Sequence, residues 1–559
     1  MPWARSLKCS SFVATLSRAR SRVSTRYNSR TMHRTALLFC ALSVLADTYP
    51  RQPGVDAQHY IFRLTLSDTS NEIDGEATIE VRFTQDQLGE LALDLTSPTD
   101  SGKGMTVTTA SVAFTHKDNR LRLTVDPPSK AGERRQFTVR YHGIPAGGLR
   151  IILNKYKERV FFSENWPNNA RHWLPMIDHP YDKATSEFIV TAPVQYQVIA
   201  NGLLQEQIDL GDGRRMTHWK QSVPVSSWLN AIGVAQFAVH HAAPVKGDIP
   251  LQTWVYRQDQ AIGPQWFEPS SRAALEFFSE HVGPYSYEKL ANVEAAGFGG
   301  GTEHASAIFY GEKSILEKPG TNLIAHEIAH QWFGNAVTEA DWDDVWLSEG
   351  FATYFTLLFT EHSRGRDAFV HDLKQSRQQI FTLEKASPEA AVLHKNLSDM
   401  KMVLNRIIYQ KGAWTLHMLR RAMGDDAFWA GIRTYYQRYR NANATTADFR
   451  KVMEEASGLQ LEAFFEQWLA RAGSPVVEGS WTYDAGAGKV RVEVSQTQAG
   501  PAYQLPLELE IDGKVESIEL TSKRQTFEFL VEQEPPAIVL DPETWALIRV
   551  GKFERVPRK

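Results

Sequence analysis

Cysteine is nearly absent from this chain of 559 residues, which contains only Cys9 and Cys40. Both precede residue 47, so the rest of the chain has no cysteine at all. Disulfide bonds and cysteine thiolate ligands are therefore excluded for that part. Any metal site there must be built from histidine and carboxylate side chains.

Long apolar runs and an excess of positive charge are also missing. No run approaches the roughly 18 apolar residues of a membrane-spanning helix, so no transmembrane segment is expected. Residues 1–46 hold eight of the 61 Lys and Arg and no Asp or Glu, which leaves 53 basic against 65 acidic side chains, or −12, in the remainder. This balance argues against nucleic acid as a partner, because a phosphate backbone is bound by clustered Lys and Arg.

Residues 1–46 have the composition of a targeting segment. An Arg- and Ser-rich stretch is followed by a short basic start at 32–34 and an apolar run over 35–46. With small residues at Val44 and Ala46, this is the layout of a secretory signal peptide that is cleaved after Ala46. The sequence therefore predicts a secreted or periplasmic protein.

The same acid-free composition also suits a mitochondrial presequence. A mitochondrial location, like a cytoplasmic one, therefore stays open as an alternative. Met32 is an alternative start of the chain.

Strand patterns occupy both ends of the chain after residue 46. Over 47–246, apolar and polar residues alternate in short bursts such as 60–66 and 136–141, separated by Gly, Pro, Asn and Asp. This pattern predicts a large N-terminal β domain. The alternation returns over 474–559, for example at 489–494, and predicts a C-terminal β-sandwich.

The part between them, residues 247–473, has a helical pattern. Its amphipathic stretches lie around residues 323–334, 349–361, 402–424 and 461–472. Apolar residues that recur three or four positions apart are typical of helices. The predicted fold class is therefore multidomain α+β, with a mainly helical domain between two β domains.

One of these stretches has the spacing of a metal site. After Thr321, which is expected to cap the helix, it contains His326, Glu327 and His330 in the pattern His-Glu-x-x-His. Residues four apart lie on one helix face, so both imidazoles can bind the same ion. Glu327 then lies beside the ion, where it can take a proton from a water without being a ligand. The pattern predicts a site for one Zn²⁺ per chain.

A catalytic zinc is held by three protein ligands and keeps one position open. Glu349 follows His330 by 19 positions, at the start of the next predicted helix, and is the natural third ligand. Taken alone, each of these residues would more often be a core or surface side chain. The triple predicts the metal.

The four residues His326, Glu327, His330 and Glu349 resemble the zinc motif of the gluzincin aminopeptidases, the family of aminopeptidase N and leukotriene hydrolase. That family joins His-Glu-x-x-His to a Glu after an 18-residue gap. The resemblance implies a saddle-shaped N-terminal β domain, a thermolysin-like catalytic domain and a β-sandwich. It also implies the activity, which is hydrolysis of the N-terminal peptide bond of peptides.

A second motif supports the resemblance. Gly300-Gly301-Thr302-Glu303-His304 stands where the family has Gly-Ala-Met-Glu-Asn. The resemblance implies that Glu303 binds the free amino group of a peptide substrate. Gly300 and Gly301 would let an extended substrate backbone approach a strand edge. The expected partners are peptides with a free N-terminus, and homo-oligomer formation stays open.

A third motif, residues 409–413, resembles the segment that carries the catalytic tyrosine of the family. The hydroxyl of Tyr409 would then donate a hydrogen bond to the substrate carbonyl oxygen as charge develops on it. Without the zinc motif, Tyr409 would be read as a packed helix aromatic and Glu303 as a solvated loop acid.

The sequence departs from the family pattern at four positions. Thr302 and His304 replace Met and Asn, which changes the surroundings of the first substrate residue. Trp166 stands where the family has a second Gln or Glu near the substrate amine, so the second amine anchor is unassigned. Thr356 replaces a Glu, which leaves unassigned the partner that should orient a histidine.

Two alternative functions are weighed against an aminopeptidase. A non-catalytic scaffold is disfavoured by the complete set of site residues. A zinc hydrolase with altered chemistry, such as an endopeptidase or an epoxide hydrolase, gains weight from Trp166. Only about 85 residues follow Ser474, so the helical domain that roofs the site in many family members is not expected, and peptide length should affect catalysis weakly.

Overall fold

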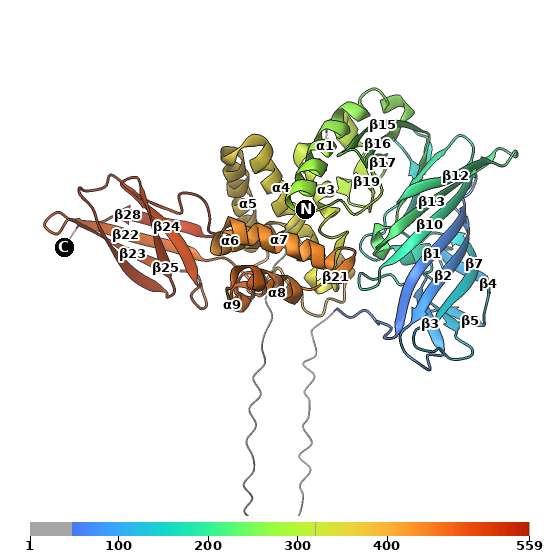
Figure 1. The fold of residues 1–559 in the computed structure, drawn as a ribbon, viewed down its shortest axis with the longest axis horizontal. Helices are drawn as coiled ribbons and strands as arrows, with labels where there is room; N and C mark the ends of the chain where they lie inside the picture. Colours follow the sequence, from blue (N-terminus) through green and yellow to red (C-terminus); the bar gives the residue numbers. More distant parts are fainter. Residues whose placement is uncertain (1–46, 319, 558–559) are drawn as a thin grey trace, which may run out of the picture. The chain divides into compact units, whose positions relative to one another are not determined.

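The structure, a computed structural model, describes residues 47–318 and 320–557, and the predicted leader lies outside them. Strands fill the first and last parts, and most helices lie between them in sequence (Figure 1). The protein is therefore a multidomain α+β protein with a β-rich N-terminal part and a helical middle part. Over the described residues, no helix is long and apolar enough to cross a membrane.

The N-terminal part contains three sheets. The largest has the strand order β12-β13-β10-β1-β2-β7-β4, in which only β1 and β10 are parallel. Its strands are β1 (Val55–Thr65), β2 (Ile73–Phe83), β4 (Gly104–Ala110), β7 (Arg134–Ile144), β10 (Ala184–Pro193), β12 (Leu203–Asp209) and β13 (Arg214–Val225). The others contain β8 (Leu149–Leu153), β9 (Arg159–Ser163), β11 (Gln197–Ala200) and β14 (Ile232–Ala235), and β3 (Glu90–Asp94), β5 (Phe114–Lys117) and β6 (Arg120–Thr124).

Alternation explains why these residues form strands. In β2 every second side chain from Ile73 to Phe83 is buried, and the intervening ones are at least partly exposed. A period of two is that of a strand with one face on a core. Ile79 of β2 lies opposite Phe137 of β7, and both side chains are buried in the same hydrophobic core.

The middle part contains nine helices among the described residues. They are α1 (Gly263–His281), α2 (Lys313–Leu316), α3 (Thr321–His330), α4 (Trp346–Arg364), α5 (Arg366–Ala386), α6 (Arg406–Met423), α7 (Asp425–Tyr439), α8 (Thr446–Ser457) and α9 (Glu462–Phe465). Short turns of 3₁₀ or π type lie at 170–172, 227–229, 257–259, 342–344, 400–402 and 466–470. Helices thus cover the four stretches that the sequence predicts as helical, the last one by α9 and the π turn.

The middle part also contains a five-stranded sheet that the sequence pattern does not predict. Its order is β15-β16-β17-β19-β18. The strands are β15 (Phe237–Val245), β16 (Ile249–Tyr256), β17 (Leu290–Ala295), β18 (Gly301–Thr302) and β19 (Ala307–Gly311). A separate pair, β20 (Val337–Glu339) and β21 (Ala442–Ala444), runs parallel.

This sheet is buried on both faces. Trp254 and Phe309 belong to the core of the N-terminal part, whereas their neighbours Val255 and Ile308 belong to the core of the helices. Because successive residues of a strand point to opposite faces, the sheet joins the two cores. The predicted domain boundary after residue 246 falls between β15 and β16, which pair with each other, and it stays a prediction.

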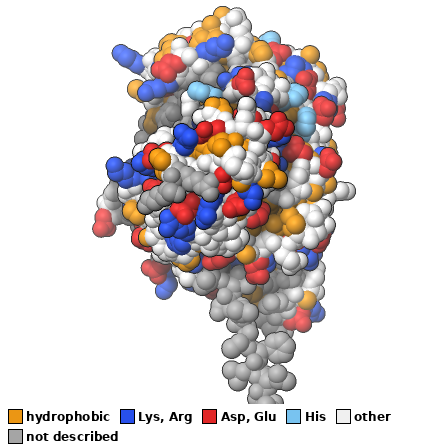
Figure 2. Space-filling view, turned by 90° about the vertical axis from the view of Figure 1, so that its left-hand side faces the viewer, with side chains coloured by type: hydrophobic (Ala, Val, Ile, Leu, Met, Phe, Trp, Pro, Cys, Tyr) orange, Lys and Arg blue, Asp and Glu red, His pale blue; other side chains and the backbone are white. Residues whose placement is uncertain are grey.

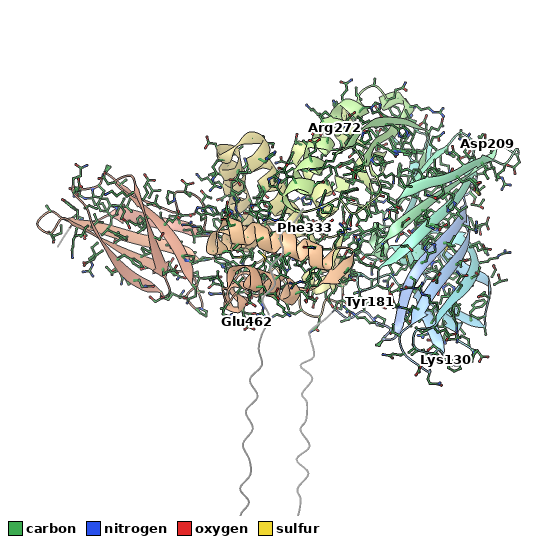
Figure 3. All side chains as sticks on the ribbon, in the orientation of Figure 1. Lys130, Tyr181, Asp209, Arg272, Phe333 and Glu462 are labelled. Carbon is green, nitrogen blue, oxygen red and sulfur yellow. The ribbon has the colours of Figure 1, made fainter. Side chains whose placement is uncertain are left out.

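Aromatic and glycine contacts hold the helices that follow the sheet. Phe333 lies just after α3 (Figure 3). The centroid of its ring is 4.8 Å from that of Phe351 and 4.6 Å from that of Phe355, both in α4. A Cβ atom on Gly350 of α4 would lie 3.0 Å from the Cα atom of Gly412 in α6. Glycine at both positions therefore allows the backbones of α4 and α6 to approach closely.

The last part consists of two sheets, a mixed one of four strands and an antiparallel one of three. One has the order β26-β23-β22-β28 and the other β25-β24-β27. The strands are β22 (Val476–Asp484), β23 (Lys489–Gln496), β24 (Leu505–Ile511), β25 (Lys514–Leu520), β26 (Arg524–Leu530), β27 (Ile538–Leu540) and β28 (Arg549–Arg555). Alternate side chains of β23 are buried, as the sequence pattern predicts.

Charges of both signs are interspersed on the face shown in Figure 2, with hydrophobic side chains between them. Acidic and basic groups do not separate by sign on that face. The expectation that nucleic acid is not a partner stays a prediction.

Candidate active site

His326, His330 and Glu349 converge. The Nε2 atoms of the two histidines on α3 are 3.2 Å apart. Oε2 of Glu349, in the first turn of α4, lies 3.5 Å from Nε2 of His326 and 3.3 Å from Nε2 of His330. A tetrahedral zinc with ligand distances of about 2.0–2.1 Å places its ligand atoms about 3.3 Å apart. The three atoms therefore have the spacing that a zinc ion needs.

The helix that carries both histidines begins one residue earlier than expected. Gly320 is its N-cap, and Thr321 is its first residue. The prediction that Thr321 caps the helix is therefore wrong, and no side chain caps this end. The helix is fixed by packing, because Ile324 and Ile328 on its other face are buried in the core.

Hydrogen bonds set the orientation of the ligands. Nδ1 of His330 lies 3.2 Å from the Phe333 carbonyl oxygen and 3.1 Å from the Ser348 hydroxyl. A proton on Nδ1, donated to the carbonyl, leaves the lone pair of Nε2 free for an ion. Oε2 of Glu349 is buried and has no hydrogen-bond donor among the described residues. A cation would satisfy that oxygen, so these residues fit a metal.

The electrostatics of the cluster also favour a cation. Burial opposes ionisation of Glu349, but His330 and His326 outweigh it and lower the pKa of this carboxyl. Burial alone would lower the pKa of His330, yet Glu349, Glu303 and Glu327 raise it to about 10. The ionised carboxylate of Glu349 between two imidazoles provides the negative charge that a divalent ion requires.

Glu327 lies against the edge strand of the five-stranded sheet. A Cβ atom on Gly301 of β18 would meet the carboxyl carbon of Glu327 at 2.4 Å, so any larger residue at 301 would displace this carboxyl group. A Cβ atom on Gly300 would have no neighbour within 4 Å, which leaves space beside the strand. Burial raises the pKa of Glu327 well above its ordinary value, as expected for a group that exchanges a proton.

Glu303 is a second buried carboxyl group in the same site. Its Oε1 atom accepts a hydrogen bond of 3.3 Å from the Trp228 indole. Its backbone carbonyl accepts hydrogen bonds of 2.9 Å from Gln331, which directly follows α3, and 2.6 Å from Asn335, in the segment after it. These bonds tie Glu303 to the histidine helix, and burial raises the pKa of its carboxyl group.

Tyr409 of α6 reaches the same cluster. Its hydroxyl donates a hydrogen bond of 2.8 Å to Oε1 of Glu349, and its ring lies nearly parallel to that of His326 with centroids 6.2 Å apart. Burial and the charge of Glu349 raise the pKa of Tyr409 well above its ordinary value. The hydroxyl therefore keeps its proton and acts as a donor.

The positions that depart from the family pattern lie as follows. His304 is fully buried on Phe309, and burial lowers its pKa to about 3. Among the described residues, the metal-ligand group consists of His326, His330 and Glu349 without His304.

The Trp166 indole packs edge-on against Trp228. The Thr356 hydroxyl donates to the Ala352 carbonyl at 2.7 Å rather than to a histidine.

Sequence reasoning overlooked several groups of the site. Glu164 lies 3.6 Å from Arg150, and burial raises its pKa to about 7, with the charge of Glu303 adding to the increase. Glu164 lies two residues before Trp166, the position where the family has a second Gln or Glu, and this proximity could have marked it in the sequence. Trp228 gave no signal, because it belongs to a segment 75 residues before Glu303 with no recognisable motif.

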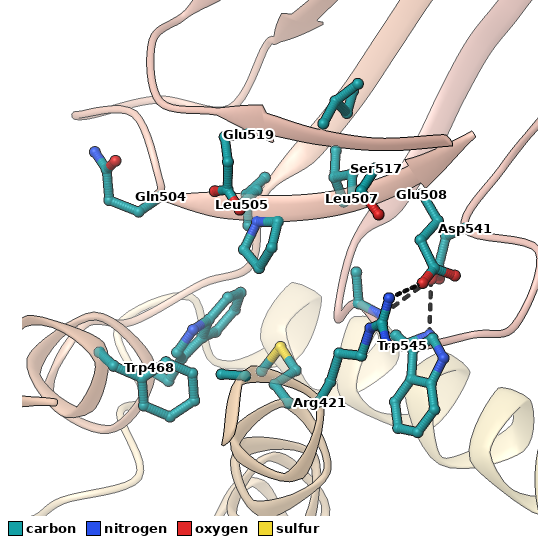
Figure 4. A pocket seen from close by; sticks show the side chains of 16 residues that line it. Arg421, Trp468, Gln504, Leu505, Leu507, Glu508, Ser517, Glu519, Asp541 and Trp545 are labelled. Carbon is teal, nitrogen blue, oxygen red and sulfur yellow. Dashed lines mark hydrogen bonds and ion pairs between the residues drawn. The ribbon is translucent and has the colours of Figure 1, made fainter. Parts of the chain in front are cut away.

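A second hollow lies between the helices and the last strands (Figure 4). This cavity of about 340 Å³ is lined by Arg421 of α6, Trp468, Leu505 and Trp545, among others. An ion pair between Arg421 and Glu508 crosses it. It contains none of the predicted site residues and no group of metal ligands, so the histidine cluster remains the candidate site.

Comparison with known proteins agrees with this geometry. Residues 56–229 match the peptidase M1 N-terminal domain, and residues 269–468 match the peptidase family M1 domain. The chain is 31% identical over 332 residues to a glutamyl aminopeptidase of Bitis rhinoceros, a match covering 56% of this chain and 34% of that protein. It is 28% identical over 344 residues to the tricorn protease-interacting factor F2 of Thermoplasma acidophilum, a match covering 59% of this chain and 43% of that protein. The chain thus spans about a third of the length of the glutamyl aminopeptidases that it matches.

Solved structures show the same fold. An M1 zinc metallopeptidase from Deinococcus radiodurans is 25% identical, with a TM-score of 0.65 over 75% of this chain and 94% of that one. A mutant of a two-domain M1 zinc metallopeptidase bound to L-arginine is 26% identical, with a TM-score of 0.66. That match covers 75% of this chain and 94% of the other. The His-His-Glu group of this chain therefore lies in the fold of zinc enzymes.

The purified protein should contain about one Zn²⁺ per chain. Glu349→Ala should lose it, because two histidines leave the ion with too few protein ligands. Glu303→Ala is the matched control, since it removes a buried carboxylate of the same site that is not a ligand. Metal analysis after gel filtration measures both. A wild-type protein without zinc, or Glu349→Ala with full zinc, would contradict the assignment.

Proposed function

Because the chain belongs to peptidase family M1, we propose that it is a zinc aminopeptidase, which hydrolyses the N-terminal peptide bond of peptides. The observation that carries the proposal is the position of Glu303. This buried carboxyl group follows an open strand edge and is tied to the helix that carries His326 and His330. A cation-binding carboxylate at that place suits a substrate with a free ammonium group.

The metal ligands would be His326, His330 and Glu349. A zinc ion bound to them supplies Lewis acidity, which lowers the pKa of a water toward 7 and polarises a carbonyl oxygen. Glu327 takes the proton from the attacking water and gives it to the nitrogen of the leaving group. Burial raises the pKa of Glu327, which makes its carboxylate a stronger base than an exposed one.

The strand β18 would hold the substrate. It is the edge of the five-stranded sheet, pairing only with β19 among the described strands, so its other side is free to bind an extended peptide backbone. The space beside Gly300 is open. The substrate ammonium would then meet Glu303, whose orientation the Trp228 indole fixes.

Tyr409 would stabilise the transition state. In this structure its hydroxyl bonds to Glu349, which places the donor beside the metal ligands. When the carbonyl oxygen of the substrate gains charge, the same hydroxyl turns to it. A well-placed donor of this kind is worth about 2.7–4 kcal/mol.

The remaining parts of the chain follow the same proposal. Residues 474–559 form a C-terminal β-sandwich, which is supported by two sheets whose buried side chains Val492 and Leu507 share one core. The domains 47–246 and 247–473 are the saddle-like and thermolysin-like units that the family resemblance implies. Residues 1–46 direct the protein to export, which is supported by their basic start and apolar run.

A zinc hydrolase with altered chemistry is the second candidate. The observation that favours it is Trp166, whose indole packs edge-on against Trp228 and Trp342, 5.3 and 4.9 Å away, in place of a second amine-binding side chain. Glu164 offers a carboxyl group nearby. N-acetylated substrates distinguish the two candidates, because an endopeptidase does not need a free amine.

Glu303→Ala should reduce kcat/KM on aminoacyl amides by about 10²-fold or more, because a buried charge pair with the ammonium is lost. N-acetylated amides should be poor substrates of the wild type. Asp248→Ala, an exposed carboxylate in the turn between β15 and β16, is the control and should change neither rate. Equal cleavage of free and acetylated substrates would contradict an aminopeptidase of this kind.

Tyr409→Phe should lower kcat by roughly 10² to 10³, with little change in KM, because its hydroxyl acts only where charge develops. Steady-state kinetics at saturating zinc test this, and metal content should stay that of the wild type. A change confined to KM would make Tyr409 a substrate-binding residue instead.

A further inference from the structure

The backbone nitrogen of Asp47 lies between the two carboxylate oxygens of Asp341. It is 3.0 Å from Oδ1 and 3.1 Å from Oδ2, in a buried contact between residues 294 positions apart. The amide N–H is shared between both oxygens in a three-centre hydrogen bond, whereas an ammonium group has three N–H donors and could give each oxygen its own. The carboxylate of Asp341 is thus placed to bind a terminal ammonium at residue 47.

Residue 47 is held in this place by its own side chain. Its carboxylate, 1% exposed, accepts hydrogen bonds of 2.7 Å from Nε2 of His179 and 3.1 Å from the backbone nitrogen of Trp342. The next two residues are also fixed. Thr48 donates from its backbone to the Leu397 carbonyl at 3.1 Å, and Tyr49 stacks on His179 with ring centroids 4.5 Å apart. Residues 47–49 are therefore held by contacts with distant parts of the chain.

Two buried carboxylates, those of Asp341 and Asp47, face this region, and each has a basic partner. Arg51, whose Nη2 lies 2.6 Å from Oδ2 of Asp341, pairs with the first, and His179 pairs with the second. Burial and the charge of Asp47 raise the pKa of Asp341. An ammonium at residue 47 would add a positive charge beside Asp341 and stabilise its carboxylate.

The sequence places a cleavable bond at this position. Val44 and Ala46 are the small residues that precede the predicted cleavage of the leader, so the first residue after cleavage is Asp47. We propose that the bond between Ala46 and Asp47 is hydrolysed by a leader peptidase, and that Asp341 then binds the new α-ammonium as a buried ion pair. Water adds across the bond: the carbonyl carbon gains the oxygen, the C–N bond breaks, and the nitrogen takes both protons of the water, which gives a carboxylate and an ammonium.

The ion pair lies at the base of the active site. Asp341 accepts a bond of 2.9 Å from the nitrogen of Asp343 and so caps the turn that leads into α4 and Glu349. The ring of Trp342, in that turn, packs against the ring of Trp228 with centroids 5.1 Å apart. The indole of Trp228 donates the hydrogen bond to Glu303. Removal of the leader would therefore complete the support of a metal ligand and of the amine-binding carboxylate.

The first test is the N-terminus itself. The full chain is produced in a host that exports it, and the intact mass of the exported protein is measured. A mass that corresponds to Asp47–Lys559 supports the proposal. Export with any other first residue overturns it.

The second test is the reactivity of the α-amine. In the folded chain that starts at Asp47, acylation of this amine, followed by mass spectrometry of the N-terminal peptide, should be at least tenfold slower than in Asp341→Asn. Asp344→Asn is the matched control. It removes a carboxylate of the same turn that bonds Thr446 at 2.6 Å and does not touch residues 47–51, so it should keep the protection.

A chain with one additional residue, starting at Ala46, covers the case in which Asp341→Asn does not fold. It keeps Asp341 and moves the amine away, so its amine should react at least tenfold faster than that of the chain starting at Asp47. Equal acylation rates for the two chains would overturn the ion pair. None of these measurements depends on the peptidase activity.

Discussion

The site depends on the burial of Glu349 between two histidines. Its Oε2 atom faces both Nε2 atoms at 3.3 and 3.5 Å and has no hydrogen-bond donor among the described residues. Such a group is costly to bury unless a cation completes it. The close approach of α4 and α6 at two glycines and the ring contacts of Phe333 hold the ligands in this arrangement.

The second constraint is the sheet edge beside the metal ligands. The strands β16, β17 and β19 of the five-stranded sheet are packed on both faces, and β18 is hydrogen-bonded to β19 at this edge. Gly301 allows the Glu327 carboxyl group to lie against this strand, and Glu303 is bonded to residues that follow α3. Binding of a peptide on the strand would thus place its first carbonyl beside the general base.

The convergence of His326 and His330 could be predicted from sequence because the period of a helix fixes the distance between residues four apart. The alternating strands were predicted for the same reason, since one exposed face leaves a period of two. The five-stranded sheet was missed because β17 and β19 are buried at every position and show no alternation.

Contacts between distant segments have no local signal either. The bond from Trp228 to Glu303 and the contact of Asp47 with Asp341 join residues 75 and 294 positions apart. Only packing of the whole chain brings them together. Thr321 shows the opposite failure, since a favourable capping residue lies inside the helix that it was expected to cap.

The central claim is that Glu327 serves a zinc ion without binding it. Glu327→Gln keeps the size of the side chain and removes the base, so kcat on an aminoacyl amide should fall by at least about 10²–10⁴-fold while the zinc content stays that of the wild type. Zinc content and kcat are measured on the same preparation. A variant that keeps its zinc and its full kcat would contradict the account.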